Sequence, residues 1–121
     1  MLTKLGIFLR KLRIDHNEIL KNMADKLGVS VSFLSAVETG KKKMPSEWNR
    51  TICCIYQLNP QQIQEFTSAI AETAKTIEFN FDHANTTQKQ LAVSFARNLP
   101  DISEEQASNL ARILLNINRR K

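Results

Sequence analysis

Hydrophobic positions along the chain recur three and four residues apart, the spacing of one face of an α-helix. Near the start, Leu5, Phe8, Leu9 and Leu12 form such a stripe, and similar stripes continue with polar residues between them. No segment alternates as a half-buried strand does. A second clear stripe contains Trp48, Ile52, Ile55 and Tyr56. The pattern predicts an all-α protein with helices near residues 3–14, 20–27, 31–38, 46–57, 61–78, 88–98 and 104–118.

Proline and glycine lie between these predicted helices. Pro45, Pro60 and Pro100 fall where one apolar pattern ends and the next begins, because a residue without an amide hydrogen fits the first turn of a helix but not its interior. Gly28 and Gly40 each follow an apolar segment, as expected for residues that accept a positive φ. The two glycines therefore bracket a very short helix.

The segment from residue 23 to residue 40 has the spacing of two short helices that cross closely. A small residue, Ala24, is expected where the helices cross, and Gly28 is expected to make the tight turn between them. Val29, Leu34 and Val37 would then point into the core. This arrangement is a helix-turn-helix.

The second of these helices is expected to begin at Ser30, whose hydroxyl can cap it. Its outward positions carry short side chains, which leave a shallow face that can enter the major groove of DNA. These candidate base-reading residues are Val31, Ser32, Ser35 and Ala36. None is the Gln, Arg or Asn that makes bidentate base contacts, so readout would depend on serine hydroxyls, methyl packing and DNA deformability.

About the first 60 residues resemble the helix-turn-helix of the Cro and phage-repressor type, also called the xenobiotic-response-element-like family of bacterial regulators. The matching segments are Leu12-Arg13, Met23-Ala24, Leu27-Gly28-Val29-Ser30, Leu34-Ser35 and Val37-Glu38-Thr39-Gly40, followed by Lys41, Pro45 and the fourth helix. The resemblance implies a five-helix repressor-type domain in residues 1–60, with an appended helical segment in residues 61–121.

The resemblance also assigns roles to single residues. It directs Val31, Ser32 and Ala36 toward bases, and it makes Arg13 and Glu38 an internal pair that fixes the first helix against the recognition helix. Phosphate contacts are expected from Thr39, Lys41 and the amides near Ser46; Lys42 and Lys43 either add to them or form a solvated loop tip. The chain departs from the family at Ile19 and Leu20, where a polar residue often caps the second helix.

Charge is unevenly distributed along the 121 residues, whose formal net charge is +5. Residues 1–59 contain ten Lys and Arg against five Asp and Glu, whereas residues 60–121 contain seven of each sign. All of the net positive charge therefore lies in the first half. Such an excess attracts polyanions, including the phosphates of double-stranded DNA.

The second half also carries a capping box and three apolar stripes, which are features of helices. Ser103 and Gln106 are spaced as a capping box, and Leu115 lies off the main stripe of the last helix. The stripes are Ile63, Phe66, Ile70, Ala74 and Ile77; Leu91, Phe95 and Leu99; and Ala107, Leu110, Ala111, Leu114 and Ile117. They indicate either an intramolecular core or the surface of a homodimer.

Other chemistry finds little support in the sequence. Cys53 and Cys54 are adjacent, so one is expected to pack inward and the other at the edge, without a disulfide or a metal. His16 and His83 stand apart from each other and from the cysteines. We therefore expect no enzyme, cofactor or metal. The chain lacks a membrane-spanning apolar run and a secretory signal, which predicts a cytoplasmic location.

The sequence leaves two functions open. In the first, the chain is a dimeric transcriptional regulator, a repressor that reads a two-fold symmetric operator through residues 31–38. In the second, it is an antitoxin-type module whose second half neutralises a partner toxin while the first half regulates their operon.

Overall fold

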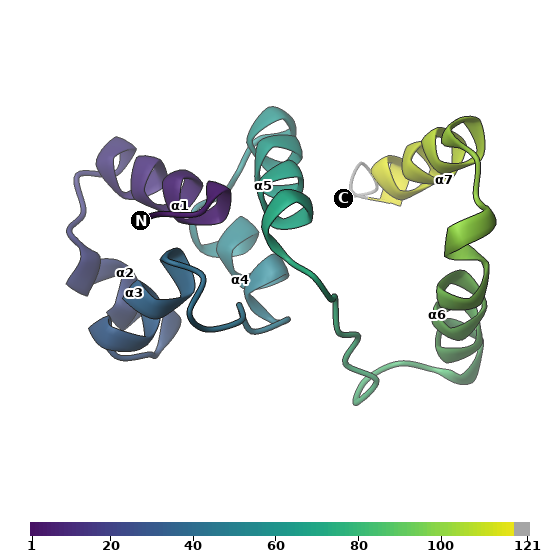
Figure 1. Ribbon diagram of the computed structural model, residues 1–121, viewed down its shortest axis with the longest axis horizontal. Coiled ribbons are helices and arrows are strands. Elements are labelled where there is room, and N and C mark those ends of the chain that lie inside the picture. Colours follow the sequence, from purple (N-terminus) through teal and green to yellow (C-terminus); the bar gives the residue numbers. More distant parts are fainter. Residues whose placement is uncertain (118–121) are drawn as a thin grey trace. The chain divides into compact units, whose positions relative to one another are not determined.

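The computed structural model describes residues 1–117 and is built from helices, with no strand among those residues. This confirms the all-α expectation. The elements, drawn in Figure 1, are α1 (Lys4–Asp15), α2 (Leu20–Leu27), α3 (Val31–Glu38), α4 (Trp48–Ile55), α5 (Pro60–Thr73), α6 (Thr86–Asn98), the short 3-10 helix η1 (Leu99–Asp101) and α7 (Glu104–Ile117).

The chain divides into two compact units, which we call the N-terminal unit (Met1–Asn80) and the C-terminal unit (from Phe81). The resemblance predicts a domain that ends at residue 60, whereas the N-terminal unit extends to Asn80. The reason is that α5 packs along α1 (Figure 1). Phe66 of α5 is fully buried and stacks on Phe8 of α1, with the ring centroids 5.0 Å apart.

One hydrophobic core holds α1 to α5 together. Fully or nearly fully buried side chains come from all five helices, and Leu58 adds another from the turn before α5. Their burial is the main favourable contribution to folding. The core comprises Leu5, Leu9, Leu12, Met23, Ala24, Leu34, Val37, Trp48, Ile52, Tyr56, Leu58, Phe66 and Ile70.

α4 is shorter than the sequence predicts, because it begins at Trp48 and ends at Ile55 instead of covering residues 46–57. Gln57 adopts a positive φ of 48°, which ends the helix and lets Leu58 turn inward to 8% exposure. Ile55, expected on the core stripe, is 37% exposed.

α5 also ends early, at Thr73 instead of residue 78. Ala74 is extended, and the chain after it runs to the loop between α3 and α4, where Lys43 Nζ contacts Thr76 Oγ1 at 3.3 Å. Ile77 therefore lies outside the helix, 56% exposed. The apolar spacing continues past Thr73, but these contacts with a distant loop hold the segment extended.

The C-terminal unit, described through Ile117, has helices and no core. α6 begins at Thr86, two residues before its predicted start, because Asn85 and Gln88 form a capping box. Ser103 and Gln106 form the expected box before α7. No residue from 81 to 117 is buried, so the stripes of α6 and α7 form no core within this unit. Residue 118, the predicted end of the last helix, lies outside the described residues.

Among the residues that the structure describes, no helix combines the length and apolar character that crossing a membrane requires.

α1 and α3 approach each other more closely than side chains normally allow. The backbone of Gly6 faces the last turn of α3, and a Cβ on Gly6 would lie 2.1 Å from the Glu38 carbonyl oxygen. Thr3, which caps α1, donates both its amide and its hydroxyl to that oxygen, at 3.0 and 3.1 Å. Glycine is therefore required at residue 6 by the contact between the two helices.

Replacement of Gly6 by alanine tests this contact. In an ordinary helix interior alanine is more stable than glycine by roughly 0.5–1 kcal/mol, but here the added Cβ must push α3 away. We expect Gly6→Ala to lower the free energy of unfolding in urea by about 1–3 kcal/mol. The exposed control Arg10→Ala should change it by less than about 0.5 kcal/mol. A Gly6→Ala protein more stable than the wild type would contradict the contact.

Candidate nucleic-acid interface

α2, a tight turn and α3 form the centre of the candidate interface. Gly28 ends α2 with φ of 71°, and Ser30 Oγ caps α3 by accepting a hydrogen bond from the Phe33 amide at 3.0 Å. Met23 and Ala24 are buried where α2 packs on α3. The turn glycine, the serine cap and the small residue at the crossing are all as expected from the sequence.

α3 has two distinct faces. Leu34, Val37 and Glu38 are buried in the N-terminal unit, and Phe33 is half-buried, edge-on to Trp48 with a centroid distance of 5.9 Å. The other face carries the candidate base-reading residues. Val31, Ser32 and Ser35 are exposed, whereas Ala36 is half-buried. A partner could therefore reach the first three directly and Ala36 only at the edge of the face.

Arg13 and Glu38, expected to pair, form a buried ion pair between α1 and α3. Arg13 Nη1 donates to Glu38 Oε2, and Nη2 donates to Oε1 at 3.2 Å. Nη1 also lies 3.5 Å from the sulfur of Met23 in α2. The guanidinium therefore links three helices, and the pair fixes the orientation of α3.

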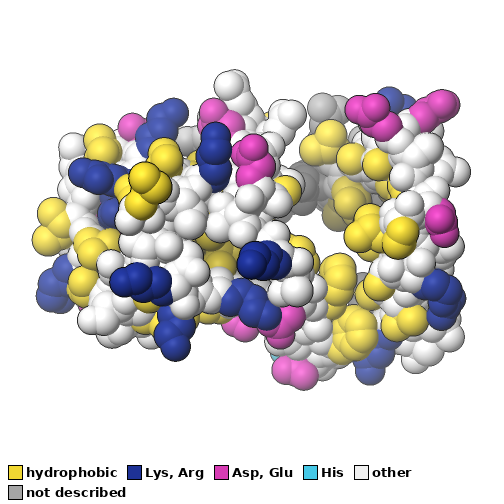
Figure 2. Space-filling view, in the orientation of Figure 1, with side chains coloured by type: hydrophobic (Ala, Val, Ile, Leu, Met, Phe, Trp, Pro, Cys, Tyr) yellow, Lys and Arg dark blue, Asp and Glu magenta, His cyan; other side chains and the backbone are white. Residues whose placement is uncertain are grey.

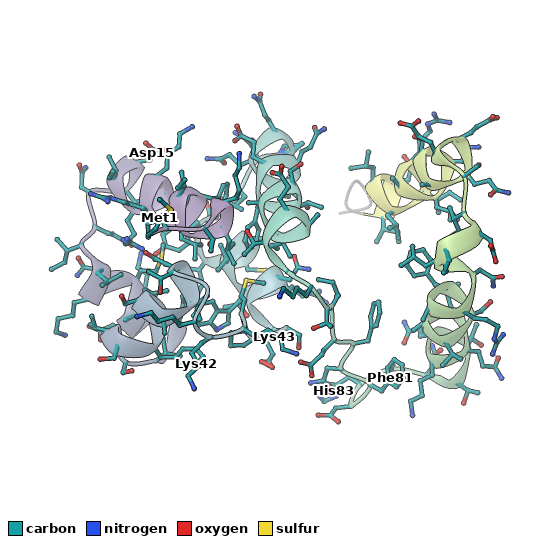
Figure 3. All side chains as sticks on the ribbon, viewed as in Figure 1. Met1, Asp15, Lys42, Lys43, Phe81 and His83 are labelled. Atoms are coloured by element: carbon teal, nitrogen blue, oxygen red, sulfur yellow. The ribbon has the colours of Figure 1, made fainter. Side chains whose placement is uncertain are left out.

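The loop after α3 projects two lysines. The amides of Lys41 and Lys42 both donate to the Ala36 carbonyl, at 2.8 and 3.1 Å, so the loop folds tightly against the end of the helix. The side chains of both residues are exposed and form no ion pair within residues 1–117. Figure 3 shows Lys42 extending outward from this loop. The two ammonium groups are available for an anionic partner.

Lys43, the third lysine of the loop, is already engaged. Its Nζ donates to Glu78 Oε1 at 2.7 Å and to Thr76 Oγ1 at 3.3 Å, and it lies beside the segment that follows α5 (Figure 3). The hydrogen bond and charge of Lys43 lower the pKa of Glu78. A phosphate would have to displace this carboxylate to bind Lys43.

The other protein groups expected to contact phosphates are also partly engaged in hydrogen bonds within the chain. The Thr39 hydroxyl donates to the Ser35 carbonyl at 3.0 Å. At the start of α4 the Trp48 and Asn49 amides bond the carbonyls of Pro45 and Ser46. The amides of Ser46 and Glu47 remain to bind an anion, but the exposed Glu47 carboxylate brings negative charge to the same place. The opening of α4 is therefore a weaker anion site than the sequence suggested.

The start of α2 lacks a side-chain cap, in keeping with Ile19 and Leu20 there. Ile19 occupies the capping position and is 66% exposed, and its amide donates to Asn22 Oδ1 at 2.8 Å. The basic side chains of the N-terminal unit are spread over the surface, and Figure 2 shows several of them on the face in view.

Sequence reasoning missed the network around Glu18. Its carboxylate accepts hydrogen bonds from Lys26 Nζ and from Tyr56 Oη, the latter at 2.6 Å. Burial would raise the pKa of Glu18, but these hydrogen bonds and the charges of Lys26 and His16 outweigh it and lower the pKa. Burial and the Glu18 carboxylate raise the pKa of Tyr56. The network ties α2 to the end of α4.

Among known proteins, no family model matches the chain, and no curated protein or solved structure gives a significant match. The resemblance to the repressor-type helix-turn-helix therefore remains a prediction.

The Arg13–Glu38 pair can be tested by removing one or both charges. Arg13→Met leaves a buried carboxylate without its partner, so we expect it to lower the free energy of unfolding by about 3–5 kcal/mol. Adding Glu38→Leu removes the isolated charge and should recover part of the loss. The control Lys21→Ala breaks an exposed pair with Asp25 and should cost less than about 1 kcal/mol. A double variant that is less stable than Arg13→Met would contradict this explanation.

The Glu18 network predicts a dependence of stability on pH. The pKa of Glu18 is lower in the folded protein than in the unfolded chain, where it is about 4.3. Its contribution is therefore complete above that value and is lost as the pH falls through the folded pKa. In urea titrations at several pH values, Glu18→Gln should be less stable than the wild type at pH 7, and the difference should shrink toward pH 3. A difference independent of pH would contradict the assignment.

Proposed function

We propose that the chain is a sequence-specific DNA-binding protein that uses α3 as its recognition helix. The observation that carries the proposal is the two-sided character of α3. One face is fixed in the core, and the other presents Val31, Ser32 and Ser35 beside the unpaired Lys41 and Lys42. A supported helix with a shallow face and adjacent positive charge suits the major groove.

The dimensions and chemistry of the groove support this proposal. An α-helix with its side chains is about 10–12 Å across, and the major groove of DNA is about 12 Å wide. Short side chains let the helix approach the base edges closely. The hydroxyls of Ser32 and Ser35 can donate or accept, and the methyl groups of Val31 can pack against the methyl of thymine.

Lys41 and Lys42 would hold the backbone while α3 reads the bases. Phosphate contacts fix the register of a protein on DNA, and each releases counterions, which makes binding sensitive to salt. In this proposal Lys43 contributes less, because Glu78 neutralises it.

The protein would act as a dimeric regulator that represses transcription by occluding a promoter. One short helix contacts few base pairs, and two copies about 34 Å apart can read two half-sites separated by one turn of DNA. The operator would then be two-fold symmetric.

Selection of duplexes from a random DNA pool by the purified protein tests base reading. We expect a two-fold symmetric site, and we expect Ser32→Gln to change the bases preferred within each half-site. Thr67→Gln, at an exposed position of α5, is the matched control and should recover the wild-type site. If no site is enriched, or if Ser32→Gln recovers the same site with the same affinity, the proposal is wrong.

Lys41→Ala tests the phosphate contact. We expect it to weaken binding to the selected site and to random DNA by similar factors, and to reduce the slope of log affinity against log salt by about one unit. Lys11→Ala, which removes an exposed lysine on the side of α1 next to α5, is the control and should leave the slope unchanged. Equal slopes for Lys41→Ala and the wild type would remove Lys41 from the interface.

A further inference from the structure

The C-terminal unit contains two amphipathic helices that find no packing partner within the described part of that unit. Within residues 81–117, α6 contacts η1, which follows it directly along the chain, and α6 and α7 make no substantial contact with each other. Isolated helices of 13 or 14 residues are marginal in water, so most of their stability must come from packing. A segment of this size without a core usually requires another chain, a metal or disulfides.

The exposed apolar residues are numerous enough to form an interface. They lie mainly on the stripe of α6 and on α7, and each is between 38% and 69% exposed. Those on the two stripes present several hundred Å² of apolar surface, a large part of the roughly 800 Å² that one partner contributes to a stable interface. They are Phe81, Leu91, Val93, Phe95, Leu99, Leu110, Ile113, Leu114, Leu115 and Ile117.

The charges indicate what covers this surface. Residues 81–117 contain three basic and four acidic residues, so two copies repel each other little. Along α7 the acidic residues Glu104 and Glu105 come first and the basic residue Arg112 follows. An antiparallel pair of such helices would bring opposite charges together, and a two-fold axis produces that arrangement.

We infer that the C-terminal unit is a self-association module in which the apolar faces of α6 and α7 pack against those of a second copy. The centre of the α7 contact is formed by Leu110, by Ile113 and Leu114, which follow it by three and four residues, and by Ile117, which follows these two by four and three. The inference deepens the proposed function, because it names the surface that would pair two recognition helices.

The first test is the molar mass of the full chain, measured by light scattering and sedimentation over a range of concentrations. We expect a dimer at micromolar concentration. Leu114→Glu places a charge in the contact and should raise the dissociation constant of the dimer at least tenfold. Ser108→Glu adds the same charge on the opposite face of α7, at an exposed position four residues before Arg112, and should leave the dimer intact. Because residue 114 belongs to no core, the urea unfolding of the N-terminal unit should be unchanged in both variants.

Three outcomes would overturn the inference. A wild-type chain that is monomeric at 100 µM would do so, and hydrogen exchange would then show whether the faces are covered within one chain or wait for another protein. Equal dimerisation of both variants, or loss of dimer in both, would also exclude this face. The result is separable from the proposed function, since a dimer that enriches no DNA sequence supports the module and rejects the recognition helix.

Discussion

The orientation of α3 depends on how its last residue, Glu38, is held by α1. The carbonyl of Glu38 accepts two hydrogen bonds from Thr3, and its carboxylate is paired with Arg13 in the core. Both contacts require the two backbones to be close, and Gly6 allows this because it has no side chain. A helix of eight residues has little stability of its own. The hold of α1 on its end therefore adds to the burial of Leu34 and Val37 in fixing α3.

Local chemistry made part of this arrangement predictable. The turn at Gly28 and the cap at Ser30 depend on residues within a few positions. Both a positive φ and a helix cap favour particular residue types, which the sequence shows. The buried Arg13–Glu38 pair followed from the resemblance. The role of Gly6 was not predicted, because a single glycine is tolerated within an amphipathic helix. Its poor helix propensity was nevertheless a signal that another backbone lies close.

Long-range contacts account for the remaining differences. The apolar spacing of α5 continues through Ala74 and Ile77, but Lys43 binds the chain at Thr76 and Glu78 and the helix stops at Thr73. Glu18 gave no sequence signal, because its partner Tyr56 is 38 positions away. The stripes of α6 and α7 were recognised correctly as helical faces. Periodicity could not show whether these stripes belong to a core or to an interface, because both give the same pattern.

In the loop that contains Lys41, Lys42 and Lys43, the third lysine is already neutralised by its ion pair with Glu78. Double-stranded DNA carries condensed cations that return to the bulk when a lysine neutralises a phosphate, and that release favours binding at low salt. A phosphate bound by Lys43 would leave the Glu78 carboxylate without its partner, so little net charge would be neutralised and few cations would be released. Of the three consecutive lysines, two would therefore set the dependence of binding on ionic strength, and Lys43 would instead hold the loop to the segment that leads to the C-terminal unit.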